Sequence, residues 1–271
     1  MKVHQIRIPF NVTEHIRRFV YVYLLEADSL YLIDSGVAGS ERQIMENIAG
    51  IGRDVSEIRG IFLTHAHPDH IGSARWFQER TGCLIYASAG EKGWIEDVDL
   101  QFRERPIPNF YQLAGKSSRV DVTVKDGDRL MPEPGLAIRV IRTAGHSTDA
   151  VSYLAERHLF TGDAVPVPGD IPILIDEHET RKTLALLKKL EGVDFYCPAW
   201  DQICSRKEMM KKIDEAVGLI DSLKSAVLAL DDETDSEGLA DRVCDSIGMP
   251  TLKANPLFSK TVDCLRERVR R

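Results

Sequence analysis

A chain of 271 residues is long enough to bury a substantial core, as one large domain or two modest ones. Its net charge of −7 argues against broad contact with nucleic acid, which requires clustered lysine and arginine, so we predict no nucleic-acid partner. No apolar run approaches the length that spans a bilayer, and residues 1–7 lack the apolar core of a signal peptide, so we predict no membrane association and a cytoplasmic location.

The first elements predicted along the chain are three strands and a helix. Short β-prone runs predict strands over residues 3–8, 20–25 and 30–33, and the last two are close enough to form a hairpin. Ser40 is expected to cap the helix that follows, which ends near Gly50.

The next segment carries a dense group of metal-ligand side chains. Residues 60–63 predict a buried strand and residues 71–80 predict a helix. The loop between them holds three histidines and an aspartate: His65, His67, Asp69 and His70. Imidazole and carboxylate groups are common ligands of zinc. Together with more distant ligands, four such groups exceed the needs of one tetrahedral ion, so the spacing suggests two ions.

After a strand predicted at residues 83–86, the regular pattern breaks. Residues 90–119 contain aromatic side chains among charges and prolines, without a sustained period. Such a stretch is more often a surface insertion or lid than a core element. Its aromatic side chains could line a substrate pocket or pack the insertion onto the body of the protein.

From residue 120 the β-rich pattern resumes. Strands are predicted at 120–124, 136–141, 151–154, 158–160 and 195–196, with a helix over 177–190. His146 lies on a glycine turn after one of these strands, and Asp163 follows another. Ligands at the ends of neighbouring strands converge readily, so both are candidates for the same metal site.

The C-terminal part is predicted to be helical. Ser205 and Glu208 form a capping box for a long amphipathic helix, and Asn255 caps a last helix whose apolar stripe ends at Val269. We predict a catalytic domain over residues 1–230, with the insertion at 90–119, and a helical extension over 231–271 packed on it. The apolar stripes are predicted core contacts, and a homodimer face is the alternative.

Several motifs resemble those of one known family. The sequence T-H-A-H-P-D-H at 64–70, followed by G-H-S at 145–147 and F-T-G-D at 160–163, resembles the signature of the metallo-β-lactamase-fold hydrolases. L-I-D-S-G at 32–36 is similar to another strand-end motif of that family, and the match covers roughly residues 15–205. The resemblance implies an α/β fold, a four-layer αβ/βα sandwich with a helical C-terminal extension, and metal ions at the edge where the two sheets open.

The resemblance also implies roles for individual residues. It assigns one metal to His65, His67 and His146, the other to Asp69 and His70, with Asp163 as a bridge and Asp34 supporting the ligand loop by hydrogen bonds. The expected cofactors are two divalent ions, zinc first, with iron or manganese as alternatives.

One element departs from the family pattern. Where the family usually has P-G-H-G, this chain has Pro198-Ala199-Trp200-Asp201, so Trp200 stands at the position of the expected last histidine. An indole cannot ligate a metal. Either Asp201 supplies a carboxylate instead, or the second metal is weaker, completed by water or absent. Trp200 is a candidate wall of the substrate pocket.

The leading functional hypothesis is a metallohydrolase. A metal-bound hydroxide would attack a small ester, thioester or lactone, as in the glyoxalase II and lactonase branches, and Asp69 would orient it. One alternative is an oxidoreductase like the persulfide dioxygenases, with one iron held by His65, His146 and Asp163. Another is a ligand-binding member of the fold without turnover. The partner predicted in each case is a small molecule.

Overall fold

The computed structural model describes residues 1–231, 236–253 and 255–267. Within them, two sheets of six strands each form the centre of the molecule. The first sheet has the order β1 (Lys2–Asn11), β2 (Arg17–Glu26), β3 (Leu30–Ile33), β4 (Ile58–Phe62), β5 (Leu84–Ser88) and β6 (Val122–Val124). The second has the order β12 (Cys204–Ser205), β11 (Phe195–Pro198), β10 (His158–Gly162), β9 (Val151–Ala155), β8 (Leu136–Arg142) and β7 (Arg129–Glu133).

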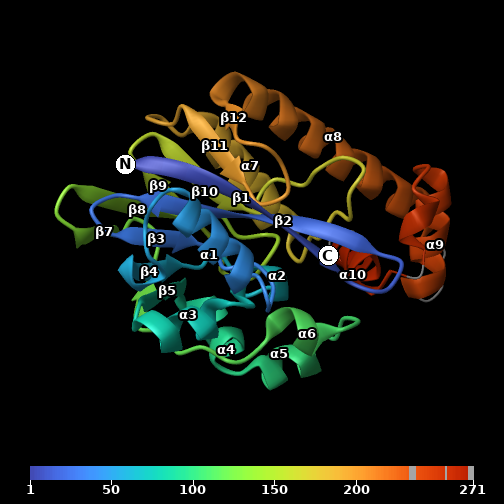
Figure 1. Cartoon of the computed structure of the whole chain (residues 1–271). Helices are drawn as coiled ribbons and strands as arrows, with labels where there is room; N and C mark the ends of the chain where they lie inside the picture. The colour runs from blue at the N-terminus through green and yellow to red at the C-terminus, as the bar shows by residue number, and fades with distance from the viewer. Residues whose placement is uncertain (232–235, 254, 268–271) are drawn as a thin grey trace.

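Helices cover the outer face of each sheet (Figure 1). The first group is α1 (Glu41–Gly50), α2 (Pro68–Ile71), α3 (Ala74–Thr81), α4 (Ala89–Glu96), α5 (Val98–Glu104) and α6 (Phe110–Ala114). The second group is α7 (Glu177–Lys189) and α8 (Arg206–Leu230), and α9 (Ser236–Ser246) and α10 (Pro256–Glu267) pack against α8. Short 3₁₀ turns precede β4 (Val55–Glu57) and α10 (Pro250–Leu252).

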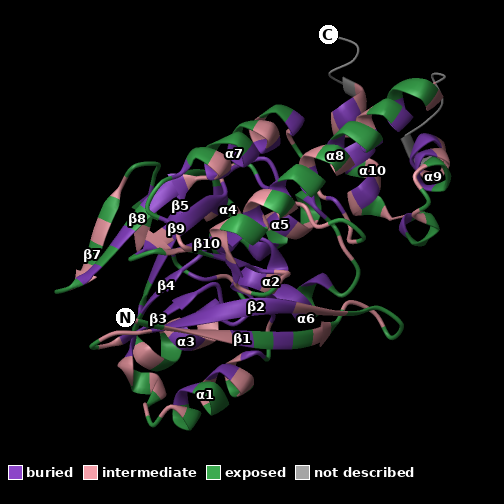
Figure 2. Cartoon of the chain, turned by 90° about the horizontal axis from the view of Figure 1, so that it is seen from above, coloured by how far each residue is buried: buried purple, intermediate pink, exposed green. Residues whose placement is uncertain are grey.

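Successive side chains of a strand point to opposite faces, and this alternation divides the core into layers. On β3, Leu32 packs towards the helices of the first group while Ile33 packs between the sheets. On β10, Leu159 joins the cluster formed with α7 and α8, and Phe160 lies between the sheets. The four layers confirm the predicted αβ/βα sandwich, and α8 shows the buried and exposed sides of an outer helix (Figure 2).

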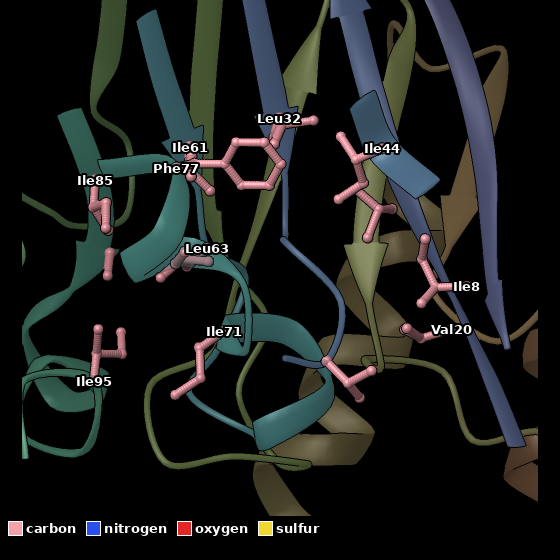
Figure 3. Packing of buried hydrophobic residues seen from close by; sticks show 14 of the residues in the cluster. Ile8, Val20, Leu32, Ile44, Ile61, Leu63, Ile71, Phe77, Ile85 and Ile95 are labelled. Atoms are coloured by element: carbon pink, nitrogen blue, oxygen red, sulfur yellow. The ribbon is translucent and has the colours of Figure 1, made fainter. Parts of the chain in front are cut away.

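The apolar layer under α1 and α3 anchors the loop that carries the histidines. Leu63 precedes this loop and Ile71 follows it, and both are buried in the same cluster as Ile61, Phe77 and Ile85 (Figure 3). Deleting either side chain would leave a cavity in this layer. Both ends of the loop are therefore fixed by packing before any polar contact is considered.

The helix predicted over residues 71–80 is broken at Gly72 into α2 and α3. A Cβ atom at this glycine would stand 2.2 Å from the amide nitrogen of Ala38 and 2.3 Å from the carbonyl oxygen of Leu113. The backbone at residue 72 therefore lies directly against the loop that precedes α1 and against α6. Only glycine allows this close approach.

The predicted helix caps have mixed outcomes. Ser205 and Glu208 form the predicted capping box of α8, and the side-chain oxygen of Asn255 accepts hydrogen bonds at the start of α10. Ser40 precedes α1 but makes no side-chain cap, so that prediction is wrong. The edge strand β7 escaped prediction because its sequence, with Pro132 among polar residues, lacks a strand pattern.

The C-terminal helices pack against α8. The side chains of Leu239, Val243, Phe258, Val262 and Leu265 are fully buried in the cluster that α8 forms with the second sheet. Val269, the predicted end of the last stripe, lies outside the described residues. The division into residues 1–230 and 231–271 and the homodimer remain predictions. Across the part of the chain that the structure describes, no helix is long and apolar enough to cross a membrane.

Candidate metal centre

Loops at one edge of the two sheets carry the candidate ligands. His65 and His67 follow β4, His146 follows β8, and Asp163 directly follows β10. One oxygen or nitrogen from each of these four residues lies within 4.8 Å of all the others. The structure therefore brings together side chains that are far apart in the sequence.

The two sheets approach closely at this edge. The amide of Val151 on β9 donates to the carbonyl of Thr64 at 2.9 Å, and the hydroxyl of Tyr153 donates to the carbonyl of Leu63 at 2.9 Å. At Gly162 φ is +52°, and a Cβ there would stand 2.6 Å from Oγ1 of Thr64. Glycine is thus required where the end of β10 meets the histidine loop.

The first group of candidate ligands converges on a common point. His67 Nδ1 lies 3.0 Å from His65 Nε2 and 2.9 Å from His146 Nε2, and the latter lies 3.2 Å from Asp163 Oδ2. Nitrogens bound to one zinc at 2.0–2.1 Å would stand about 3.4 Å apart in a tetrahedron. The spacing of these atoms, and their chemistry, fit one divalent ion.

A second group shares Asp163 with the first. His70 Nε2 lies 3.3 Å from Asp163 Oδ1 and 3.6 Å from Asp69 Oδ2. The His70 nitrogen and the Asp163 oxygen are both buried, and neither has a hydrogen-bond partner among the described residues. An unsatisfied buried polar atom is costly. Two such atoms facing each other fit a second ion, with Asp163 between the two groups.

Asp34 sets the protonation pattern of two histidines. Its Oδ2 lies 2.8 Å from His70 Nδ1, and since a carboxylate only accepts, this nitrogen carries the proton. The hydroxyl of Thr64 donates to Asp34 and therefore accepts from His65 Nδ1 at 3.0 Å. In the neutral form of each imidazole, the Nε2 atom is therefore the one without a proton, and both Nε2 atoms are turned towards Asp163. Asp34 thus lies where the resemblance implied.

Burial and charge act on these groups in opposite ways. Burial lowers the pKa of His65 and His67 well below the usual range and lowers that of His146 to about 4, which favours the neutral imidazoles that metals require. Burial alone would lower the pKa of His70, but the carboxylates of Asp163 and its neighbours raise it well above the usual value. Burial alone would raise the pKa of Asp163, but the surrounding imidazoles outweigh it, so the pKa lies below its usual value.

The insertion supplies two supporting residues that the sequence analysis missed. Glu91 on α4 is 2% exposed, and its carboxylate accepts from the amide of Ala66 and from the hydroxyl of Ser147. The side-chain amide of Gln101 on α5 donates to the carbonyl of Ala66 at 2.7 Å. Ala66 stands between the first two histidines, so both of its backbone groups are held by the insertion. No local pattern marks Glu91 or Gln101, because their partners are distant in sequence.

The structure does not bring Asp201 to the cluster. Its Oδ2 lies 2.5 Å from Lys212 Nζ on α8, its Oδ1 accepts from the amide of Gln202, and it lines a separate hollow. Trp200 faces the other way, with the guanidinium of Arg18 4.5 Å from its ring. The replacement of the expected histidine by Asp201 therefore has no geometric support, and the second group holds three candidate ligands.

We expect Asp201→Asn to leave the metal content of the protein unchanged. The substitution weakens one half-exposed ion pair, which costs up to about 1 kcal/mol of unfolding free energy. Metal per chain, measured by elemental analysis after dialysis, should match the unmodified protein. Loss of one ion in this variant would show instead that Asp201 turns towards the cluster when metal binds.

The candidate ligands open into a cavity of about 350 Å³. His67, Asp69, His146 and Asp163 form part of its wall, and Trp200 forms another part. The rest of the wall comes from the hairpin between β1 and β2, the insertion, the loop over residues 165–173 and the segment over residues 251–257. Trp200 and the insertion were predicted to form the pocket, whereas the hairpin between β1 and β2 was not.

The aromatic side chains of the insertion do not line this cavity. Phe102 contacts Phe110 and Tyr111, with ring centroids 5.3 and 5.1 Å apart. The insertion instead contributes a cation and several apolar side chains to the wall: Arg105, Ile107, Pro108 and Leu113. Of the two roles considered for the aromatics, packing is the one observed.

Comparison with known families identifies the class of protein to which this fold and this cluster belong. A sequence model of the Metallo-beta-lactamase superfamily matches residues 15–198, and the chain belongs to that superfamily. Its members bind metal ions, which accords with the histidine and aspartate cluster found here.

Curated relatives match part of the chain. A hydroxyacylglutathione hydrolase of Thiobacillus denitrificans is 33% identical over 40% of this chain and 33% of its own length. The probable polyketide biosynthesis zinc-dependent hydrolase BaeB of Bacillus velezensis is 32% identical over 42% of this chain and 41% of its own. The matches thus span less than half the length of these relatives.

Solved structures match over nearly the whole chain. A metallo-beta-lactamase family protein of Thermus thermophilus gives a TM-score of 0.76 at 17% identity, covering 99% of this chain and 93% of that protein. A beta-lactamase domain protein of Burkholderia ambifaria gives 0.71 at 16% identity, covering 98% and 87%. At these identities the likeness establishes the fold alone.

Proposed function

We propose that this protein is a hydrolase with two divalent ions, zinc first and iron or manganese as alternatives, that cleaves an ester, thioester or lactone in a small molecule. One observation supports the two-ion part: His70 Nε2 and Asp163 Oδ1 are buried and face each other beside the first group of candidate ligands, and neither has a hydrogen-bond partner in the described part of the chain. The partial match to a hydroxyacylglutathione hydrolase supports the thioester class.

The candidate ligands would divide between two ions. His65, His67 and His146 would hold one ion, and Asp69 with His70 the other, with Asp163 shared between them. Divalent ions bound there lower the pKa of a water ligand and polarise a carbonyl oxygen. The remaining tasks of the protein are to orient the substrate and to exclude bulk water from the cavity.

Asp69 is the residue placed to handle a proton. It lines the cavity, and its side chain is 17% exposed, so it can reach a substrate. Burial raises the pKa of its carboxyl, while the nearby His70 lowers it. A carboxyl with a raised pKa accepts and returns protons closer to neutral pH than an exposed one. We therefore assign the orientation of the attacking water and the transfer of its proton to Asp69.

A panel of substrates tests the proposal. Protein loaded separately with zinc, manganese or iron is assayed on a hydroxyacylglutathione, a simple acyl thioester, an aryl ester and a lactone. We expect turnover on at least one, two ions per chain, and loss of turnover with a chelator. His158→Gln, on β10 but outside the cluster, is the matched control for His146→Gln. A single iron per chain with oxygen consumption would support the oxidoreductase hypothesis instead.

A further inference from the structure

One charged side chain in the cavity has no partner. Arg105 directly follows α5 and is only 6% exposed, yet it lines the cavity beside Asp69, His146 and Asp163. Its guanidinium makes no hydrogen bond or ion pair with any residue that the structure describes. A guanidinium has five N–H donors and is seldom buried without an acceptor.

The nearest acidic groups are engaged elsewhere. Asp69 Oδ2 lies 3.6 Å from His70 Nε2, and Asp163 lies among the imidazoles. Glu91 accepts from the amides of Ala66 and Asp149. Burial lowers the pKa of Arg105 to about 10, although Asp69, Asp163 and Glu91 act to raise it. The side chain therefore keeps its positive charge at neutral pH without being neutralised by a direct contact.

The other cationic side chains that line the cavity, unlike Arg105, are each paired with a carboxylate. Arg18 pairs with Asp170 and stacks on Trp200. Lys253 lies 2.7 Å from the carboxylate of Asp245. Metal ions bound by Asp69 and Asp163 would neutralise the negative charge of those carboxylates. Arg105 would then be the charged side chain, among the described residues of the cavity, whose charge no protein group balances.

We propose that Arg105 binds an anionic group carried by the substrate, so that the natural substrate is a small acyl compound with one carboxylate near the scissile bond. The inference rests on the proposed function and adds the class of acyl group to it. A planar guanidinium matches a carboxylate through two parallel hydrogen bonds. A phosphate would call for more donors than the single unpaired cation that the described part of the cavity offers.

The remaining wall indicates the rest of the substrate. Apolar side chains make up much of the wall of the same cavity: Ile107, Pro108, Leu113, Val165, Ile171 and Leu257. An apolar chain or ring would be removed from water there, at about 25 cal/mol per Å². The substrate class is therefore a monoanionic acyl compound with an apolar part, of a size that fits about 350 Å³.

The first test measures binding, without requiring turnover. Hexanesulfonate, an anion that ligates metals poorly, and neutral hexanesulfonamide are titrated into the protein as isolated. We expect the sulfonate to bind about tenfold or more tightly than the sulfonamide, and Arg105→Met to remove that difference. Arg103→Met, which removes an exposed charge from the same helix, should retain it. Equal binding of the sulfonate to Arg105→Met would overturn the proposal.

A second readout separates anion binding from a structural role. Because an unpaired buried charge costs folding free energy, we expect the melting temperature of Arg105→Met to equal or exceed that of the unmodified protein. Arg105→Lys should retain part of the preference for the sulfonate. A fall in the melting temperature of Arg105→Met, with the sulfonate preference intact, would assign Arg105 to the scaffold and reject the inference.

Turnover distinguishes failure of this inference from failure of the proposed function. The succinyl thioester of N-acetylcysteamine is compared with the same thioester whose free carboxyl is methylated. A preference of about tenfold or more in kcat/KM for the free carboxylate, lost in Arg105→Met, supports the inference. Equal turnover of both thioesters overturns the inference but leaves the hydrolase proposal standing. Sulfonate binding without turnover of any substrate in the panel overturns the hydrolase proposal alone.

Discussion

Asp163→Asn is expected to lower kcat/KM by about a thousandfold or more and to reduce the metal content of the protein. An amide is a much weaker metal ligand than a carboxylate, and this residue is shared by both groups of candidate ligands. Metal ions contribute several kcal/mol to catalysis of this type, and about 4 kcal/mol corresponds to a thousandfold. Among the candidate ligands, Asp163 is the one that belongs to both groups, so its loss should affect both ions.

The measurement needs a variant that loses a carboxylate elsewhere. Asp221→Asn removes an exposed acid that pairs with Arg181, and should change neither metal content nor turnover by more than about twofold. Elemental analysis and kinetics are carried out on the same preparations, after circular dichroism shows that each is folded. Retention of two ions and full activity in Asp163→Asn would contradict the shared role.

The fold and most of the site could be predicted because their signals are local. The run from Thr64 to His70 places four candidate ligands within seven consecutive residues, in the loop after β4 and at the start of α2. Glycines mark the sharp turns before His146 and Asp163. The alternation of apolar residues was sufficient to place most strands. A short ligand motif between a predicted strand and a predicted helix can be recognised from neighbouring residues alone, without knowledge of the contacts made in the folded chain.

The supporting residues could not be predicted in this way. Glu91, Gln101 and Arg105 lie in a segment without a regular pattern. Glu91 and Gln101 hold residues that are distant in the sequence, and Arg105 lines the cavity beside residues that are equally distant. Asp201 shows the opposite error, since its place in the sequence suggested a ligand while its carboxylate pairs with Lys212. Position along the chain does not determine the direction in which a side chain points.

Asp34→Ala is expected to destabilise the protein by about 3 kcal/mol and to weaken metal binding by about 10–100-fold. The substitution leaves the amide and hydroxyl of Thr64 and Nδ1 of His70 without their acceptor, and all three groups are buried. Residue 34 also has φ of +59°, which alanine tolerates less well than aspartate or asparagine. Thermal unfolding with a chelator present isolates the structural part of the loss.

Asp34→Asn separates the hydrogen-bond pattern from the backbone strain. Asparagine tolerates the positive φ and keeps an oxygen for Thr64, but its amide group can donate to His70 Nδ1. The imidazole would then carry its proton on Nε2 and could not ligate an ion through that atom. We therefore expect a smaller loss of stability than in Asp34→Ala but a similar loss of metal affinity, measured by competition with a chelating dye.

Asp54→Asn, which changes an exposed turn, is the control. Equal metal affinity in Asp34→Asn and the unmodified protein would show that the carboxylate does not set the proton position of His70.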